Sequence, residues 1–67
     1  MRRRARQELE PLVVGLDDAE RILSLGRSTI YELIDTGEFE SFLVGRRRML
    51  TYASLAAWVD RRRQEVA

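Results

Sequence analysis

The side chains of this sequence that could do chemistry are mainly arginines, and they are grouped. Three clusters lie at residues 2–6, 46–48 and 61–63. A guanidinium group binds a phosphate or the edge of a guanine through two parallel hydrogen bonds. All 12 basic residues are arginine, and 11 acidic residues hold the formal net charge at +1. The clusters therefore predict local binding of a polyanion, or else solvated surfaces that keep a small protein soluble.

The sequence lacks the residues that most enzymes and metal sites use. It contains no Cys and no His, which removes thiol nucleophiles, disulfides, the usual zinc ligands and the commonest general base. The remaining Asp, Glu, Ser and Tyr residues form no recognisable acid–base or nucleophile arrangement. We therefore expect no enzyme activity, no catalytic residue, no cofactor and no metal site.

The length of 67 residues, 45% of them hydrophobic, predicts one small folded domain. Residues 1–10 are basic and poor in large apolar side chains, so we expect a flexible N-terminal arm there. Pro11 ends this segment, and residues 11–67 form the domain. No apolar run approaches the ~20 residues that a membrane span needs.

The first elements of the domain are predicted by caps and helical spacing. Residues 12–14 are apolar and β-branched, which fits either a short strand or an extended core segment. Gly15 stands at the position of a helix N-cap, with two aspartates in the first turn, so a helix is expected from Leu16 to about Leu23. Residues 24–26 break it.

A second helix follows the break at once. Gly26 or Ser28 caps its start, and Gly37 after Thr36 ends it. At 100° per residue the helix has two distinct faces. Its apolar face comprises Ile30, Leu33 and Ile34. The opposite face comprises Ser28, Tyr31, Glu32 and Asp35.

The period of the pattern then changes from helix to strand. Residues 39–44 and 47–50 are expected to pair as a hairpin around Gly45 and Arg46, in a type II′ turn. Thr51 is the expected N-cap of a last helix, from Tyr52 to about Arg63. Its inward face should carry Tyr52, Leu55, Trp58 or Val59, and Val66.

The predicted order is helix, tight turn, helix, β-hairpin, helix. Two helices joined by a three-residue turn form a helix-turn-helix unit, whose second helix enters the major groove of DNA. A basic hairpin beside it can lie in the adjacent minor groove. The expected fold is therefore mainly α with a small β-hairpin wing, a winged helix-turn-helix.

Five motifs in this order carry a resemblance to a known family. They are LDDAERIL at 16–23, RSTIY at 27–31, Gly37-Glu38, VGRR at 44–47, and Leu55 with Trp58. From about residue 12 to residue 59 the sequence resembles the excisionase family of helix-turn-helix proteins, related to the MerR-like winged helices.

The resemblance implies a protein that binds double-stranded DNA. Many excisionases, also called recombination directionality factors, are phage or mobile-element proteins that bind repeated sites near an attachment site and bend the DNA. They contact an integrase, a tyrosine or serine recombinase, and direct it toward excision. Self-association on the repeats and a cytoplasmic, nucleoid-associated location are expected. Two alternatives stay open: a small winged-helix transcriptional regulator, and a protein-interaction module without DNA binding.

The expected DNA-binding residues lie on the second helix and the wing. They are Arg27, Ser28, Thr29, Tyr31, Glu32, Arg46, Arg47 and Arg48. Glu32 occupies a position where many members of the family carry a basic residue, so it either repels phosphates or accepts a hydrogen bond from a cytosine amine. Ser24 stands where the family often has Gly in the turn.

Overall fold

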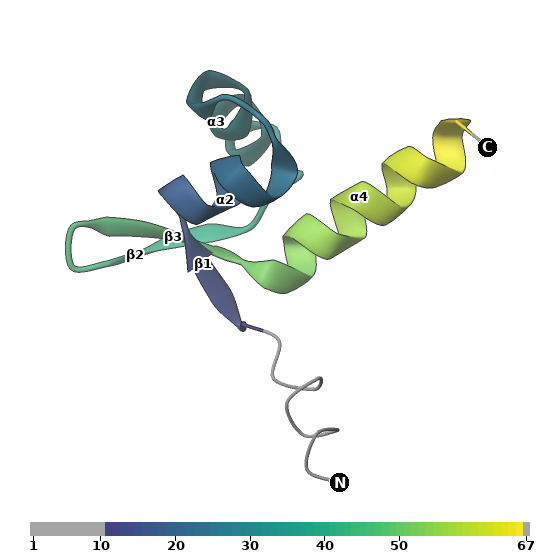
Figure 1. The fold of residues 1–67 in the computed structure, drawn as a ribbon. Coiled ribbons are helices and arrows are strands. Elements are labelled where there is room, and N and C mark those ends of the chain that lie inside the picture. The colour runs from purple at the N-terminus through teal and green to yellow at the C-terminus, as the bar shows by residue number, and fades with distance from the viewer. Residues whose placement is uncertain (1–10, 67) are drawn as a thin grey trace, which may run out of the picture.

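The computed structural model describes residues 11–66 (Figure 1). The elements in chain order are β1 (Val13–Gly15), α2 (Leu16–Leu23), α3 (Arg27–Asp35), β2 (Ser41–Val44), β3 (Arg47–Thr51) and α4 (Tyr52–Val66). The arm predicted for residues 1–10 lies outside the described residues, as does residue 67, so the predicted boundary at Pro11 stays a prediction.

The three strands form one antiparallel sheet in the order β1-β3-β2. Residues 13–15, for which the sequence allowed a strand or an extended segment, pair with β3 as a strand. The hairpin of β2 and β3 is closed by the pair Val44 and Arg47 around a two-residue turn. Gly45 has a φ of 63° whereas Arg46 has no positive φ. This combination is the one that the predicted type II′ turn requires.

The predicted helix-turn-helix unit is confirmed in its bounds. Gly26, in extended conformation, is the N-cap of α3. Ser24 ends α2 in the left-handed conformation, with a φ of 58°, and its N–H donates to the carbonyl of Glu20. After α3, Gly37 has a φ of 86° and donates its N–H to the carbonyl of Ile34.

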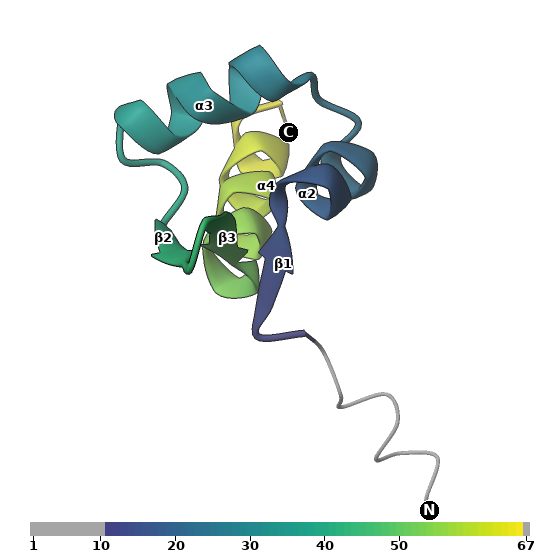
Figure 2. The ribbon, with the colours of Figure 1, turned by 90° about the vertical axis from the view of Figure 1, so that its left-hand side faces the viewer.

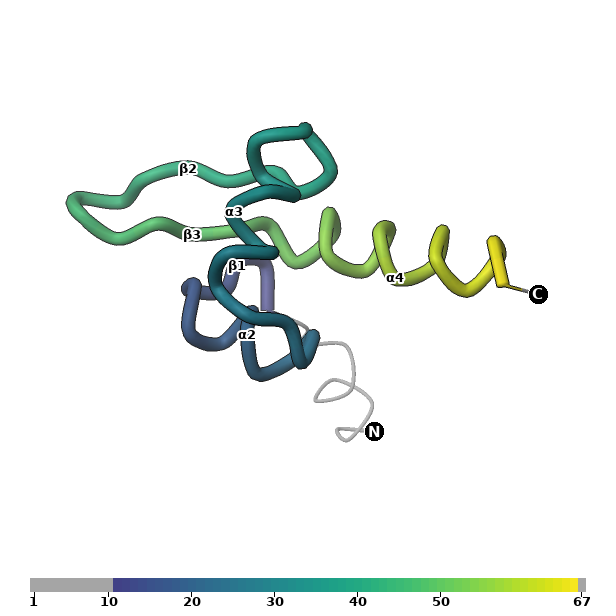
Figure 3. Tube along the Cα trace, turned by 90° about the horizontal axis from the view of Figure 1, so that it is seen from above, coloured from purple at the N-terminus to yellow at the C-terminus, as the bar shows by residue number. Residues whose placement is uncertain are grey.

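The last helix, α4, begins at Tyr52 as predicted, but it ends later than predicted. The hydroxyl of Thr51 accepts a hydrogen bond from the N–H of Ser54 at 3.3 Å, which is the expected N-cap contact. The helix continues to Val66 rather than ending near Arg63. The prediction that Val66 belongs to the inward face is wrong, because its side chain is 83% exposed. Figure 3 shows the reason: α4 extends away from the body of the molecule, and its C-terminal end is the part farthest from the body.

A small core holds these elements together. Its buried members are Val14, Ala19, Ile30, Phe39, Leu50 and Leu55. The other side chains predicted for the core, Leu33, Ile34 and Trp58, are partly buried and pack against it. The ring of Trp58 meets that of Phe39 edge-on at 5.5 Å between centroids. Ile22, which shares the helical spacing of α2, is 52% exposed instead.

The core lies between the sheet and the helices α2 and α3, which both stand on one side of the sheet (Figure 1). Figure 2 shows α3 crossing the top of the molecule with the tip of the hairpin below it. The hairpin and α4 project in opposite directions (Figure 3). Helix, tight turn, helix and a projecting hairpin make this a winged helix-turn-helix, so the expected fold class is confirmed.

Candidate nucleic-acid interface

The outer face of α3 is free of the core. Ile30 is fully buried on the inner face, whereas the side chains of the outer face are exposed. The exposed side chains are Ser28, Thr29, Tyr31, Glu32 and Asp35. This face offers hydroxyl groups and two carboxylates but no basic side chain. It can therefore donate hydrogen bonds to phosphates or bases, but it adds no positive charge.

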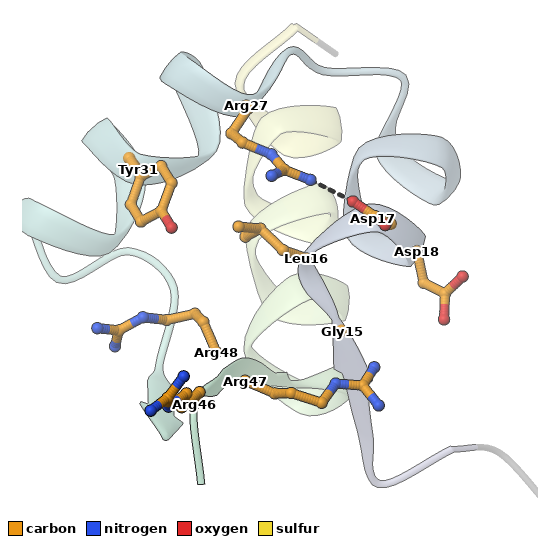
Figure 4. A pocket seen from close by; sticks show the side chains of 9 residues that line it. All are labelled: Gly15, Leu16, Asp17, Asp18, Arg27, Tyr31, Arg46, Arg47 and Arg48. Atoms are coloured by element: carbon orange, nitrogen blue, oxygen red, sulfur yellow. Dashed lines mark hydrogen bonds and ion pairs between the residues drawn. The ribbon is translucent and has the colours of Figure 1, made fainter. Parts of the chain in front are cut away.

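Arg27, at the start of α3, is held by two carboxylates of α2. Its Nε lies 2.5 Å from a carboxylate oxygen of Glu20, and its Nη2 pairs with Asp17 (Figure 4). The hydrogen bond to Glu20, together with the charges of both carboxylates, raises the pKa of Arg27 above its usual value. The side chain of Arg27 stays about half exposed, at 51%. A nucleic acid that reaches Arg27 must therefore compete with Asp17 and Glu20.

The three arginines of the wing, Arg46, Arg47 and Arg48, are separated by the alternation of the strand. Arg48 lies on the same face of β3 as the buried Leu50, two residues on, and it donates to the hydroxyl of Ser41 at 2.9 Å. Arg47 lies on the opposite face. Arg47 and Arg48 thus point to opposite faces of the hairpin, and it is Arg48 that lies on the side of α3.

The side chain of Arg47 passes close to Gly15. A Cβ atom at residue 15 would lie only 3.3 Å from Nη2 of Arg47. The guanidinium group therefore passes close over the backbone at the end of β1, as Figure 4 shows. The sequence suggested only a helix cap for Gly15, and nothing in the pattern pointed to this contact with Arg47.

A hollow of about 370 Å³ lies between α3, the start of α2 and the wing. It is lined by Gly15, Leu16, Asp17, Asp18, Arg27, Tyr31, Arg46, Arg47 and Arg48. In Figure 4 the side chain of Tyr31 extends from α3 in the direction of the hairpin that carries Arg48. Five of the eight predicted site residues meet here, whereas Ser28, Thr29 and Glu32 do not line the hollow. Asp17 and Asp18 also line the hollow and add negative charge to it, although the sequence did not predict them as site residues.

The ion pairs among residues 11–66 divide the arginines into two groups. Five of the eight arginines in that part of the chain pair with a carboxylate: Arg21, Arg27, Arg61, Arg62 and Arg63. The three wing arginines take part in none of these pairs. The basic cluster at residues 61–63 is thus paired with neighbouring carboxylates, and it lies on α4, which projects away from the wing (Figure 3).

Residues 11–66 contain no group of three or more acidic side chains placed to hold a metal ion. Within the same range, no helix has the length and apolar character needed to cross a membrane.

Comparison with known proteins identifies the family. A family model described as "Helix-turn-helix domain" matches residues 13–63, which cover all three strands and all but the last residues of α4. No curated protein matches the chain. No solved structure matches it either. The family match covers most of the sequence and agrees with the observed order of elements. The chain therefore belongs to the helix-turn-helix domain family.

Proposed function

We propose that this protein binds double-stranded DNA with a preference for sequence, through the outer face of α3 and the wing. It acts as a binding protein rather than an enzyme. The observation that carries this proposal is the position of the unpaired charge: within residues 11–66, the arginines outside the ion pairs are Arg46, Arg47 and Arg48, all on the wing. Arginines that no carboxylate holds, on a projecting hairpin, are suited to phosphates and to a narrow minor groove.

In this proposal α3 and the wing have different tasks. The wing supplies the positive charge, which attracts every duplex. The face of α3 supplies Ser28, Thr29 and Tyr31 as hydrogen-bond donors and contact groups. Glu32 repels the phosphate backbone except where a cytosine amine can donate to it. Attraction by the wing and selection by α3 together give a preference for sequence.

We further propose that the protein is an excisionase that binds repeated sites near an attachment site, bends the DNA and directs an integrase toward excision. The resemblance of the five motifs supports this role, and so does the size of the domain. One helix and one wing contact few base pairs, so several copies side by side are needed for high affinity. A cytoplasmic, nucleoid-associated location follows from the role.

The wing is tested by replacing Arg46 and Arg47 with Ala and measuring duplex binding over a salt titration. We expect weaker binding to every duplex. The slope of log K against log salt should flatten by roughly one unit for each phosphate that the wing no longer binds. The matched control is the double replacement of Arg21 and Arg63 by Ala, which removes the same charge from arginines already paired with carboxylates.

The control variant should bind nearly as the natural chain does. Equal affinity and an equal salt slope for the natural chain and the Arg46/Arg47 variant would eliminate the wing as a DNA-binding element.

The role is tested by a gel shift with DNA flanking the gene, against a shuffled duplex. A ladder of specific complexes at physiological salt supports an excisionase on repeated sites. A single specific complex at a promoter supports a transcriptional regulator instead. Equal binding of both duplexes, abolished by ~0.2 M salt, leaves only non-specific attraction and favours the protein-interaction module.

A further inference from the structure

We propose that Ser41 is a positioning residue for Arg48, and that Arg48, held in this way, is the arginine of the wing that discriminates between DNA sequences. Arg46 and Arg47, in contrast, attract every duplex alike. The inference rests on the proposed function, the binding of duplex DNA with a preference for sequence. It adds Ser41 to the interface and gives the three wing arginines different tasks.

A hydrogen bond within the hairpin holds the side chain of Arg48. Its Nη1 donates to the hydroxyl oxygen of Ser41 at 2.9 Å. Ser41 lies opposite Leu50 in the register of β2 and β3, so Ser41 and Arg48 are diagonal neighbours on one face of the hairpin. Both residues are partly buried, whereas Arg46 and Arg47 are exposed. The contact therefore draws the guanidinium group of Arg48 back along the hairpin, away from its tip.

Arg48 differs from every other arginine in the described part of the chain. Of the eight arginines in residues 11–66, five pair with carboxylates. Arg46 and Arg47 take part in none of the side-chain hydrogen bonds within that range, and Arg48 alone is hydrogen-bonded to a neutral side chain. A serine hydroxyl accepts one N–H of the guanidinium group and leaves its charge and its other donors available. Arg48 is thus oriented and still carries an uncompensated charge.

The oriented guanidinium group lies on the side of the wing that faces α3. Arg48 and Tyr31 both line the hollow between α3 and the wing. In Figure 4 the side chain of Arg47 extends toward Gly15, whereas that of Arg48 extends in the opposite direction, on the side of Tyr31. A duplex that is bound against the outer face of α3 therefore also meets Arg48.

An arginine held in one direction contributes differently from an exposed arginine without a partner. The exposed one can turn to whichever phosphate is near, and phosphates lie along every duplex, so it adds affinity without preference. The held one reaches only an acceptor that lies along its direction. The positions of such acceptors depend on base edges and on groove width, which both change with sequence. Arg48 is therefore suited to selection, and Arg46 and Arg47 are suited to attraction.

The test compares a preferred duplex with an unrelated one. The preferred duplex is the one that the natural chain enriches from a random-sequence pool, and the unrelated one is its shuffled version. The ratio of the two dissociation constants at one salt concentration measures the preference. Arg48→Ala should lower this ratio by about tenfold, which is the discrimination that one good arginine contact provides. Arg46→Ala removes the same charge and should weaken both complexes equally, so that the ratio is unchanged.

Ser41→Ala tests the positioning role, because it changes no charge. We expect the ratio to fall by about threefold to tenfold, the effect of one lost hydrogen bond. The affinity for the shuffled duplex and its salt slope should stay unchanged. Ser41→Thr keeps the hydroxyl group and should keep the ratio. In a chain that already carries Arg48→Ala, Ser41→Ala should lower the ratio no further. Urea denaturation of each variant shows whether the domain is folded under the conditions of binding.

The orientation of Arg48 is also measured without DNA. Relaxation of the ¹⁵Nε–H groups of the free chain should show Arg48 ordered, and Arg46 and Arg47 mobile, on the picosecond-to-nanosecond timescale. Ser41→Ala should make Arg48 as mobile as Arg46. An Arg48 side chain that is mobile in the natural chain, or that Ser41→Ala leaves ordered, overturns the positioning role.

Failure of this inference is distinguishable from failure of the proposed function. If the natural chain enriches no duplex, binding with a preference for sequence is wrong, and the selective role of Arg48 is overturned with it. If the natural chain prefers one duplex and Ser41→Ala keeps that preference, this inference alone is overturned. An equal fall of the ratio in Arg46→Ala and Arg48→Ala would overturn the separate tasks of the wing arginines.

Discussion

Identical side chains of this domain differ in what they can bind, because their surroundings differ. Arg27 stands at the start of α3, the helix that we propose to face DNA, yet Asp17 and Glu20 already hold its guanidinium group. The arginines of the wing have no carboxylate partner among the described residues. A phosphate therefore gains a free guanidinium group at the wing, whereas at Arg27 it must displace two carboxylates. The difference lies in the neighbouring groups and not in the residue type.

Releasing Arg27 should strengthen DNA binding. In the double variant Asp17→Asn/Glu20→Gln, the guanidinium group is free and two negative charges beside the interface are gone. We expect tighter binding to every duplex and a salt slope steeper by about one unit. The matched control is Asp60→Asn/Glu65→Gln, which removes the same charge beside arginines of α4. An identical gain in both variants would mean that net charge alone is responsible and that Arg27 does not contact DNA.

Among the elements, the turn between α2 and α3 fixes the direction in which α3 points. Ser24 holds this turn in the left-handed conformation, with a φ of 58°. That conformation costs a residue with a Cβ about 1–2 kcal/mol, and it costs glycine far less. Ser24 stands where similar sequences often have glycine. Its left-handed conformation is therefore a local strain in a turn that is otherwise normal.

The variant Ser24→Gly should stabilise the domain. Relief of the left-handed strain outweighs the greater freedom of glycine in the unfolded chain, for a net gain of about 0.5–1 kcal/mol. Urea denaturation measures the gain as a higher midpoint with an unchanged slope. Gly37→Ala is the opposite control: at a φ of 86° with no atom within 4 Å, it should lose stability through strain alone. A lower midpoint for Ser24→Gly would contradict this account of the turn.

For the whole molecule, stability depends on a core of few side chains. The hairpin and α4 project from the body, so much of their length is exposed (Figure 3). A single small core of this kind supplies only about 3–5 kcal/mol of net stability. Leu50 is completely buried in the central strand β3. It belongs to the core that lies between the sheet and the helices α2 and α3.

The variant Leu50→Ala should unfold the domain. Truncation of a buried leucine costs roughly 2–5 kcal/mol, which is comparable to the expected net stability. Circular dichroism at 25 °C should show the loss of helix, and thermal melting should show no cooperative transition. Leu12→Ala is the matched control, because Leu12 is 86% exposed. A cooperative transition near that of the natural chain would show that the core does not depend on Leu50.

The sequence by itself determined the local elements of this protein. Caps, turn residues and apolar spacing predicted α2, the three-residue turn, α3 and the hairpin with its turn type. These features depend on residues a few positions apart, and their propensities act whether or not the rest of the chain is in place. The order of these elements along the chain was also enough to predict the fold class.

Only the tertiary structure decided which strands pair, which side chains are buried and which charges meet. It placed β1 beside β3, left Ile22 and Val66 exposed, and brought Asp17 to Arg27 across the turn. Burial and ion pairing depend on which residues far apart in the sequence become neighbours. Local sequence patterns do not contain this information. For the same reason the sequence showed three similar arginine clusters, whereas among residues 11–66 the fold paired the one on α4 with carboxylates and left the one on the wing without a carboxylate partner.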